Sequence, residues 1–219
     1  MIMSPAMRKK KSALGPRGVG GVAYGDQQTL TLQPDSATAI NAVMNSATPT
    51  AHNHSAPNMI IGEPNSATDS VNRLLMKFDL SGLPDNALLD EVTLTLNCNG
   101  DFSDNARTLS IYRMKIAWTK TGVTWNKYDG VTDWPGGAGG FGSVDCEQTP
   151  IATRAMSASE SLTDKIITFT PTSKAALDLG YGWMLRVDTE VNDGYRFAMA
   201  DNGTAANRPE LIIKYRVPL

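Results

Sequence analysis

Residues 73–96 read RLLMKFDLSGLPDNALLDEVTLTL, and two parts of this stretch alternate between apolar and polar side chains. Successive side chains of a strand point to opposite faces, so alternation with a period of two predicts a strand with one buried face. Residues 91–98 place one set of side chains on the buried face: Val92, Leu94, Leu96 and Cys98. Residues 73–80 do the same with Leu74, Met76, Phe78 and Leu80. The turn SGLPDN separates the two strands.

Outward from this pair, the sequence predicts further short strands at residues 108–114, 165–169, 183–187, 195–199 and 211–215. Clusters of Gly, Asn, Asp and Pro separate them, as is typical of turns. One short helix is expected before Gly180, with Thr170 as its N-cap and Pro171 at its first position. Its apolar stripe is predicted to be Ala175, Ala176 and Leu179. This pattern predicts an all-β fold, a jelly-roll-like antiparallel β-sandwich with one short helix.

Composition divides the 219 residues into two parts, an extended basic arm at residues 1–27 and a sandwich domain at residues 28–219. Within the domain, residues 38–72 are rich in Asn, Ser, Ala, Thr and Pro, and we interpret them as long ordered loops around one strand at residues 59–61. Charged residues make up 19% of the chain, and runs of Glu, Lys and Leu are scarce. That composition excludes an all-α protein or a coiled coil.

Positive charge is concentrated in the arm. The first 25 residues contain five basic and no acidic residues: Arg8, Lys9, Lys10, Lys11 and Arg17. The remaining residues carry 15 basic and 22 acidic side chains. A short basic arm cannot bury enough apolar surface to order itself. We therefore interpret it either as a solvated tail or as an arm that docks on another subunit or on nucleic acid through its charge, with these five residues as candidate contacts.

Catalytic and redox motifs are weak in this sequence. Gly137, Gly139 and Gly142 satisfy the pattern GxGxxG, but no strand precedes them, so a flexible surface loop is the expected structure. Cys98 and Cys146 permit at most one disulfide, and neither has a base beside it in the sequence. We expect no enzyme and no cofactor.

Metal binding is not expected either. His52 and His54 are the only histidines, and no carboxylate stands at a defined metal-ligand spacing from them. The Asp-rich turns at residues 101–105 and 188–193 offer oxygen ligands for Ca²⁺, but ordinary turn chemistry explains them and neither resembles an EF-hand loop.

Four stretches resemble, in order, segments of the DNRLRE-type β-sandwich modules. They are residues 73–96, AWTKTGVTWNKYDG at 117–130, GYGWMLRV at 180–187 and ANRPELIIKY at 206–215. The resemblance covers roughly residues 28–215 and implies a jelly-roll sandwich similar to carbohydrate-binding modules. Such modules usually occur in secreted, cell-surface or polysaccharide-degrading proteins, and some occur in phage structural proteins.

Exposed aromatic rings are the remaining candidates for binding, because the faces of sugars stack on them. Trp118 and Trp125 belong to a segment that carries the resemblance and are expected in the core, and Trp183 alternates with buried neighbours. Tyr128 and Trp134 lie in the loop NKYDGVTDWPGG and are the candidate pair for a sugar platform or a partner contact. The alternative is that they form a lid over the end of the sandwich.

Three hypotheses of function follow. The first is a non-enzymatic virion structural protein, such as a capsid decoration, head-fibre or tail component, which docks on capsid or tail subunits or on its own copies through the arm and the loops at 38–72. The second is a carbohydrate-binding module of a cell-surface or polysaccharide-recognition system, with a glycan as ligand. Nucleic-acid binding through the arm is the weakest, because five charges in a tail give only salt-sensitive, nonspecific affinity.

The expected localisation is the virion, as the first hypothesis requires. The basic run at the N-terminus lacks the apolar segment that follows it in a secretory signal. No stretch approaches the ~20 apolar residues of a membrane span. We therefore expect a protein that is made in a host cytoplasm and is not exported by the usual route.

Overall fold

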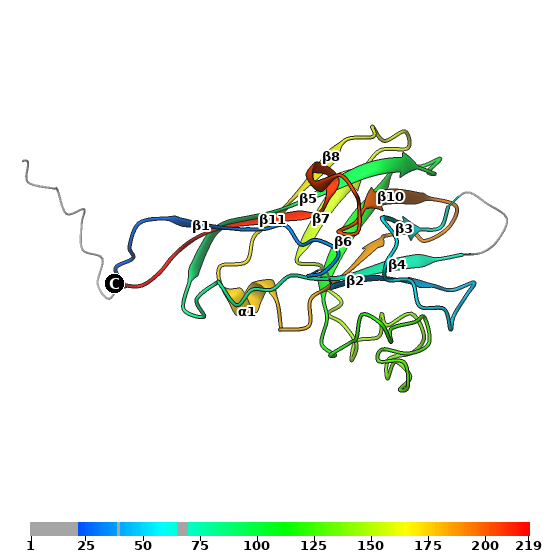
Figure 1. Cartoon of the computed structure of the whole chain (residues 1–219), viewed down its shortest axis with the longest axis horizontal. Coiled ribbons are helices and arrows are strands. Elements are labelled where there is room, and N and C mark those ends of the chain that lie inside the picture. Colours follow the sequence, from blue (N-terminus) through cyan, green and yellow to red (C-terminus); the bar gives the residue numbers. More distant parts are fainter. Residues whose placement is uncertain (1–21, 39, 65–69) are drawn as a thin grey trace, which may run out of the picture.

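The computed structural model describes residues 22–38, 40–64 and 70–219, which form an antiparallel sheet folded into two layers (Figure 1). The first layer has four strands in the order β1 (Gln28–Leu32), β11 (Glu210–Arg216), β5 (Leu88–Asp101) and β8 (Asp164–Phe169). All neighbours are antiparallel, as alternating strands with one buried face favour. The predicted all-β antiparallel sandwich is confirmed.

The second layer follows from β5, whose last residues pair with β10 (Gly194–Ala198). Beyond β10 the order is β3 (Asn58–Gly62), β4 (Asn72–Lys77), β9 (Trp183–Val187), β6 (Arg107–Arg113) and β7 (Ala152–Met156), with β2 (Ile40–Asn45) paired along β4. A strand that changes layer makes the corner of a sandwich. The register of β10 shifts between Arg196 and Phe197 at this corner.

The main core lies between the layers and centres on Trp183, which is 1% exposed. Its ring centroid is 5.7 Å from that of Phe78 and 5.1 Å from that of Phe169, so it touches both layers. Its indole Nε1 donates a hydrogen bond to the carbonyl of Leu177 at 2.9 Å. The ring therefore joins β9 to β8 and to the short helix at once.

A second core lies on the opposite face of the second layer. Leu75 of β4 and Met184 of β9 point away from the main core, yet each is 0% exposed. They are covered by residues 114–151, which we call the cap and which connect β6 to β7 (the green loops at the bottom of Figure 1). The cap contributes Trp118, Val123, Trp134 and Cys146 to this cluster. A long connection without strands of its own is thus ordered by its own apolar side chains.

Arg73 of β4 fastens the cap to the second layer. Its Nε and Nη2 donate to the two carboxylate oxygens of Glu190 at 2.9 and 2.8 Å, and its Nη1 donates to the carbonyl of Gly139 at 2.9 Å. The guanidinium also lies 4.8 Å from the ring centroid of Trp125. Planar, bidentate contacts of this kind suit arginine and not lysine.

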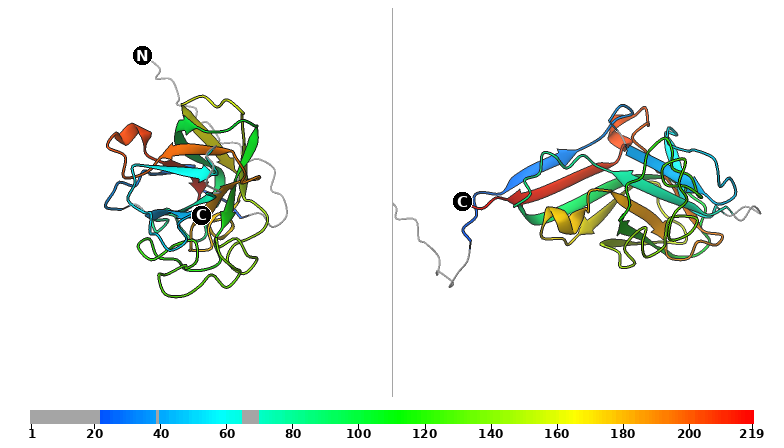
Figure 2. Two further views of the ribbon diagram at one scale, coloured as in Figure 1. Left: turned by 90° about the vertical axis from the view of Figure 1, so that its right-hand side faces the viewer. Right: turned by 90° about the horizontal axis from the view of Figure 1, so that it is seen from below.

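The two ends of the described chain run side by side as a ribbon that projects from the sandwich (Figure 2). Tyr24 bridges Pro218, and the backbone N–H of Leu219 donates to the carbonyl of Ala23 at 2.9 Å. The ribbon continues the pairing of β1 with β11. Arm residues 1–21 lie outside the described residues.

Three strands escaped the sequence analysis, β1, β2 and β7. The prediction of one strand within residues 38–72 is wrong, because β2 precedes β3 there. Residues Ala42, Val43 and Met44 are consecutive and all buried, since the main core covers one face of β2 and the cap covers the other. A strand buried on both faces has no alternation to detect.

The helix prediction is wrong in its boundaries. Helix α1 spans only Lys174–Leu177, and its N-cap is Ser173 instead of Thr170. The chain before it stays extended because Ser173 bridges Leu88 and the carbonyl of Thr172 accepts the N–H of Leu89. Leu177 is the buried residue of the helix, and Leu179 of the predicted stripe is 40% exposed.

Trp183→Ala is expected to lower the free energy of unfolding by about 3–5 kcal/mol, because it removes the largest ring of the main core and leaves a cavity. Urea denaturation followed by circular dichroism measures it. The control Ile166→Ala, at a side chain in β8 that is 57% exposed, should change stability by less than ~0.5 kcal/mol. A loss below about 1 kcal/mol for Trp183→Ala would contradict this role.

Candidate functional site

A surface groove lies beside α1, between the end of β4 and the edge of the first layer. It has two sections that meet at four shared residues, Thr38, Lys77, Phe78 and Asp79. The helix section, of about 520 Å³, is completed by Ile40, Leu80, Ser81, Lys174, Asp178 and Gly180. The strand section, of about 260 Å³, is completed by Thr31, Leu32, Gln33 and Pro34. We call the whole feature the α1 groove.

The lining combines an apolar floor with polar walls. Phe78 and Leu80 are only 4% and 8% exposed and belong to the main core, so they form the floor. Hydroxyl, amide, carboxylate and ammonium groups stand around them on Thr38, Ser81, Gln33, Asp79 and Lys77. Binding sites for small polar molecules typically have this composition, because apolar area supplies affinity and a few polar groups fix orientation.

One rim of the groove is the turn Gly180–Tyr181–Gly182, which ends α1 and leads into β9. Both glycines have positive φ, +94° and +76°, and a Cβ on Gly182 would lie 2.4 Å from the carbonyl oxygen of Met76. Only glycine fits such a position without strain. Tyr181 between them is 38% exposed, and neighbouring Leu179 is 40% exposed. These two exposed apolar side chains therefore flank Gly180, which lines the helix section, although neither of them lines the groove itself.

Hydrogen bonds from three directions fix this turn. The Asp178 carboxylate accepts the backbone N–H groups of Gly180 and Gly182, both at 2.9 Å. Lys77 Nζ donates to the carbonyl of Gly180 at 2.8 Å, and Trp118 Nε1 of the cap donates to the carbonyl of Tyr181 at 2.8 Å. A rim held in this way loses little conformational freedom when a ligand binds.

Asp79 is the exposed carboxylate of the groove. Hydrogen bonds from the backbone N–H and the hydroxyl of Ser81 lower its pKa, and the positive charges of Lys174 and Lys77 lower it further. Asp79 is therefore ionised at neutral pH and accepts hydrogen bonds only. Lys174 donates to the carbonyl of Leu83 and to Asp85, so its ammonium group is held at the groove wall.

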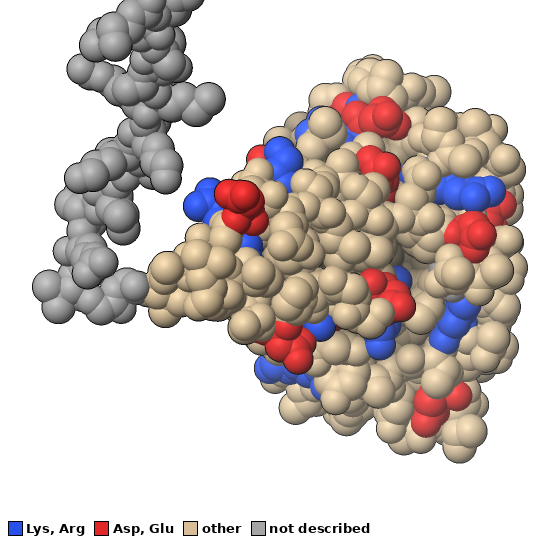
Figure 3. Space-filling view, turned by 60° about the vertical axis from the view of Figure 1, so that its left-hand side comes forward, with Lys and Arg blue, Asp and Glu red and all other residues tan. Residues whose placement is uncertain are grey.

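The face of the molecule drawn in Figure 3 carries charges of both signs. In the view of Figure 3, Lys and Arg side chains are interspersed with Asp and Glu, and neither sign gathers into a large patch. No described helix is long and apolar enough to pass through a membrane.

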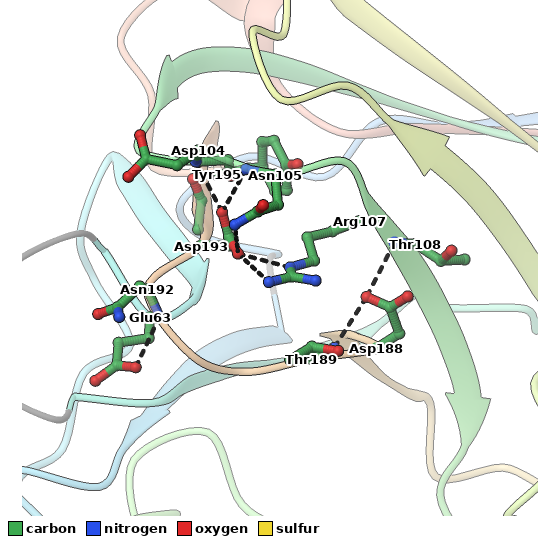
Figure 4. A network of polar contacts seen from close by, with 12 residues as sticks. Glu63, Asp104, Asn105, Arg107, Thr108, Asp188, Thr189, Asn192, Asp193 and Tyr195 are labelled. Atoms are coloured by element: carbon green, nitrogen blue, oxygen red, sulfur yellow. Dashed lines mark hydrogen bonds and ion pairs between the residues drawn. The ribbon is translucent and has the colours of Figure 1, made fainter.

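The two Asp-rich turns, for which turn chemistry was the expected role, meet in a hydrogen-bond network around Asp193 (Figure 4). The Asp193 carboxylate is 0% exposed and accepts the backbone N–H groups of Asp104 and Asn105 at 2.8 and 2.9 Å. Arg107 donates its Nε to the same carboxylate at 2.6 Å and forms an ion pair with it through Nη2. Hydrogen-bond donors thus occupy the Asp193 carboxylate oxygens that a cation would need as ligands. The geometry favours a structural role of these residues in the turns.

The candidate pair Tyr128 and Trp134 lies in the cap. The prediction of an exposed Trp134 is wrong, because its side chain is 3% exposed and its Nε1 donates to the carbonyl of Thr124 at 3.1 Å. Tyr128 is half-buried, and the two ring centroids are 5.8 Å apart. Both rings pack in or against the second core, so they match the lid alternative better than a stacking platform. Trp118, expected in the core, is 9% exposed and lies there.

The remaining sequence candidates are dispersed. The basic residues Arg8, Lys9, Lys10, Lys11 and Arg17 lie outside the described residues. His54 contacts Ser55, and no group of three or more His, Cys, Asp or Glu side chains suited to a metal occurs in the described chain.

The glycine loop and the cysteines also have structural positions. Gly139 and Gly140 are buried, and a Cβ atom on either would lie 3.0 Å or closer to Trp125 or Trp134. The glycine loop therefore packs against the tryptophans of the cap, to which it belongs, instead of cradling a phosphate. Cys98 and Cys146 are free and lie in different cores. Burial raises the pKa of Cys146 to about 11, which makes it a poor nucleophile.

Sequence reasoning missed Tyr181, Asp79 and Lys77 as site residues. The signal that was available is the pair of glycines around Tyr181 in GYG, which marks a turn that exposes the residue between them. No comparable signal marks Asp79, because only folding brings β1, β4 and α1 together.

Comparison with known families gives one match. Residues 28–132 match carbohydrate-binding module family 96. No curated protein matches the chain. The matched region is thus similar to a carbohydrate-binding module, and it includes β1, β4 and the groove residues from Thr31 to Ser81. The match favours the carbohydrate-binding hypothesis over the virion hypothesis.

Asp193→Asn is expected to lower the free energy of unfolding at pH 7 by about 3–5 kcal/mol, because it leaves Arg107 without its buried partner. Burial raises the pKa of Asp193, but the N–H groups of Asn105 and Asp104 and the Arg107 guanidinium outweigh it, and the pKa lies below its usual value. This stabilisation is therefore complete above the unfolded pKa of about 3.9 and is lost as the pH falls through the lower folded value.

Urea denaturation of both proteins between pH 3 and pH 8 tests this dependence. The difference between the native protein and Asp193→Asn should stay constant from pH 5 to 8 and shrink below about pH 4. Asp133→Asn, in an ion pair whose Asp side chain is 80% exposed, should change stability little. A difference that grows towards low pH would contradict the assignment.

Proposed function

We propose that residues 28–219 form one non-enzymatic carbohydrate-binding module of the DNRLRE type, and that the α1 groove is its glycan-binding site. The observation that carries the proposal is the position of the groove within the family match: residues 28–132 supply its floor and most of its walls. The match supports carbohydrate binding, and the overlap of the groove with the matched residues supports the proposed location.

The chemistry of the groove suits a sugar. A pyranose ring has an apolar face of C–H groups and a perimeter of hydroxyls. Tyr181, which is 38% exposed and follows the lining residue Gly180, is the ring that we assign to the apolar face. Asp79, Lys77 and Thr38 of the lining offer acceptors and donors for the hydroxyls. Ionised Asp79 accepts hydrogen bonds that are stronger than those between neutral groups.

The position of the cap also supports the α1 groove as the glycan-binding site. In the described chain the cap covers the outer face of β4, β9 and β6, so that face offers no open sheet surface to a polysaccharide. Tyr181 and Tyr24 are the aromatic side chains of the described residues with at least 36% exposure, and Tyr24 lies in the terminal ribbon. Of these two exposed rings, Tyr181 is the one whose neighbour in the chain, Gly180, lines the groove.

Tyr181→Ala and Asp79→Ala are each expected to weaken glycan binding by roughly tenfold or more, because one removes the stacking surface and the other a charged acceptor. Affinity electrophoresis through gels that contain neutral, uronic-acid or amino-sugar polysaccharides identifies the ligand, and titration calorimetry then measures the affinity.

Two tyrosine variants serve as controls. Tyr24→Ala removes a ring of similar exposure, 36% against 38%, far from the groove. Tyr128→Ala tests the cap site that the sequence suggested. Both should retain the binding of the native protein. Loss of binding in Tyr128→Ala alone would move the site to the cap, and no retardation of the native protein by any polysaccharide of the panel would end the carbohydrate proposal.

A further inference from the structure

The strand section of the α1 groove follows the free edge of β1. Strand β1 pairs with β11 through all five of its residues, and no described residue forms a backbone hydrogen bond with its other edge. Thr31 and Leu32 of β1 line the strand section, together with Gln33 and Pro34, which follow the strand. The groove thus borders on backbone N–H and C=O groups that have no protein partner.

Two other outer strands, β2 and β8, each have a protein hydrogen-bond partner at one point of their outer edge. Val43 of β2 donates its N–H to the carbonyl of Asn53 at 2.7 Å, and Arg154 donates to the carbonyl of Ile166 on β8 at 2.9 Å. Exposed edges are usually blunted by charges, prolines or such contacts. Residues 27–33 are QQTLTLQ and contain neither charge nor proline. The edge of β1 is therefore an open row of donors and acceptors.

The two sections are joined and not separate. Thr38, Lys77, Phe78 and Asp79 line both, so a ligand that leaves the helix section along Phe78 enters the strand section. Beyond this junction, the strand section adds the Thr31 hydroxyl and the Gln33 side chain. The Gln33 amide nitrogen donates to the carbonyl of Ala205 at 3.1 Å, which leaves its side-chain oxygen as an acceptor.

We propose that the α1 groove binds a stretch of several sugar units, with one part of the chain in the helix section and the next units along the free edge of β1, whose backbone groups bond to the sugar hydroxyls. The ligand class is then a linear polysaccharide and not a single sugar. This inference rests on the proposed function. It adds that both sections of the groove contribute to the affinity, so an oligosaccharide must be long enough to contact both of them.

The charge pattern agrees with a hydroxyl-rich ligand in the strand section. That section has one basic and one acidic side chain, Lys77 and Asp79, both at the shared junction, and its remaining lining is neutral. An unpaired strand edge exposes both N–H donors and C=O acceptors, so its partner must both accept and donate hydrogen bonds. Sugar hydroxyls can do both. An added protein strand also meets that requirement, so self-association through β1 is the competing outcome.

Length dependence tests the proposal. The probes are size-graded oligosaccharides made from the polysaccharide that retards the full chain most strongly, and calorimetry gives the affinity of each. We expect the affinity to rise at least tenfold as the oligosaccharide becomes long enough to span both sections, and then to level off.

Matched threonine variants locate the second section. Thr31 and Thr168 occupy the same cross-strand row of the first layer, at its opposite edges, and both side chains are exposed. Thr31→Ala should weaken binding of the long oligosaccharides about threefold to tenfold and leave the shortest binder unchanged, whereas Thr168→Ala should affect neither. In hydrogen–deuterium exchange, the long oligosaccharide should slow exchange in residues 29–34.

The outcomes separate the two proposals. If Tyr181→Ala abolishes binding while affinity is independent of length and Thr31→Ala has no effect, the glycan site stands and the extension along β1 is wrong. If sedimentation shows a dimer whose formation protects residues 29–34 without sugar, a second copy occupies the edge and the extension is likewise overturned. If no oligosaccharide binds, the proposed function itself fails.

Discussion

The structure depends on a sheet layer that is apolar on both faces. In β4, Leu74 and Met76 pack in the main core, while Leu75 between them points the other way and is just as fully buried. A sheet with one solvated face would leave Leu75 and Met184 in water. The cap removes them from water, so the second core is a requirement of the strand sequences and not an addition to the sandwich.

Covering that face has consequences for the groove, although the cap does not line it. Trp118 of the cap holds the carbonyl of Tyr181, and Met114 at the start of the cap donates its N–H to the carbonyl of Gly182 at 2.9 Å. The same turn is held from the helix side by Asp178. The rim of the α1 groove is thus rigid because two separate parts of the chain bond to its backbone.

One-sided burial made β5 easy to predict, whereas two-sided burial had mixed outcomes: β4 and β9 were predicted and β2 was missed. The alternation at residues 91–98 predicted the central part of β5, and Trp183 pointed inward as expected. Strand β2 was missed because both of its faces are covered, which erases the alternation. For Trp134 the sequence left both a sugar platform and a lid open, because nothing local in its loop reveals that the loop folds back onto the sheet. Local composition reports turns well and burial poorly.

The sequence by itself determined the fold class and the likeness to carbohydrate-binding modules, because period-two alternation and ordered short motifs are properties of the chain that need no knowledge of contacts. It also contained the glycine pair that exposes Tyr181. Only the tertiary structure decided where a ligand can bind. The α1 groove joins residues from β1, the end of β4 and α1, which are far apart in the chain, and its walls exist only once the layers have packed. A concave surface arises from the distances between elements, and no single stretch of sequence encodes those distances.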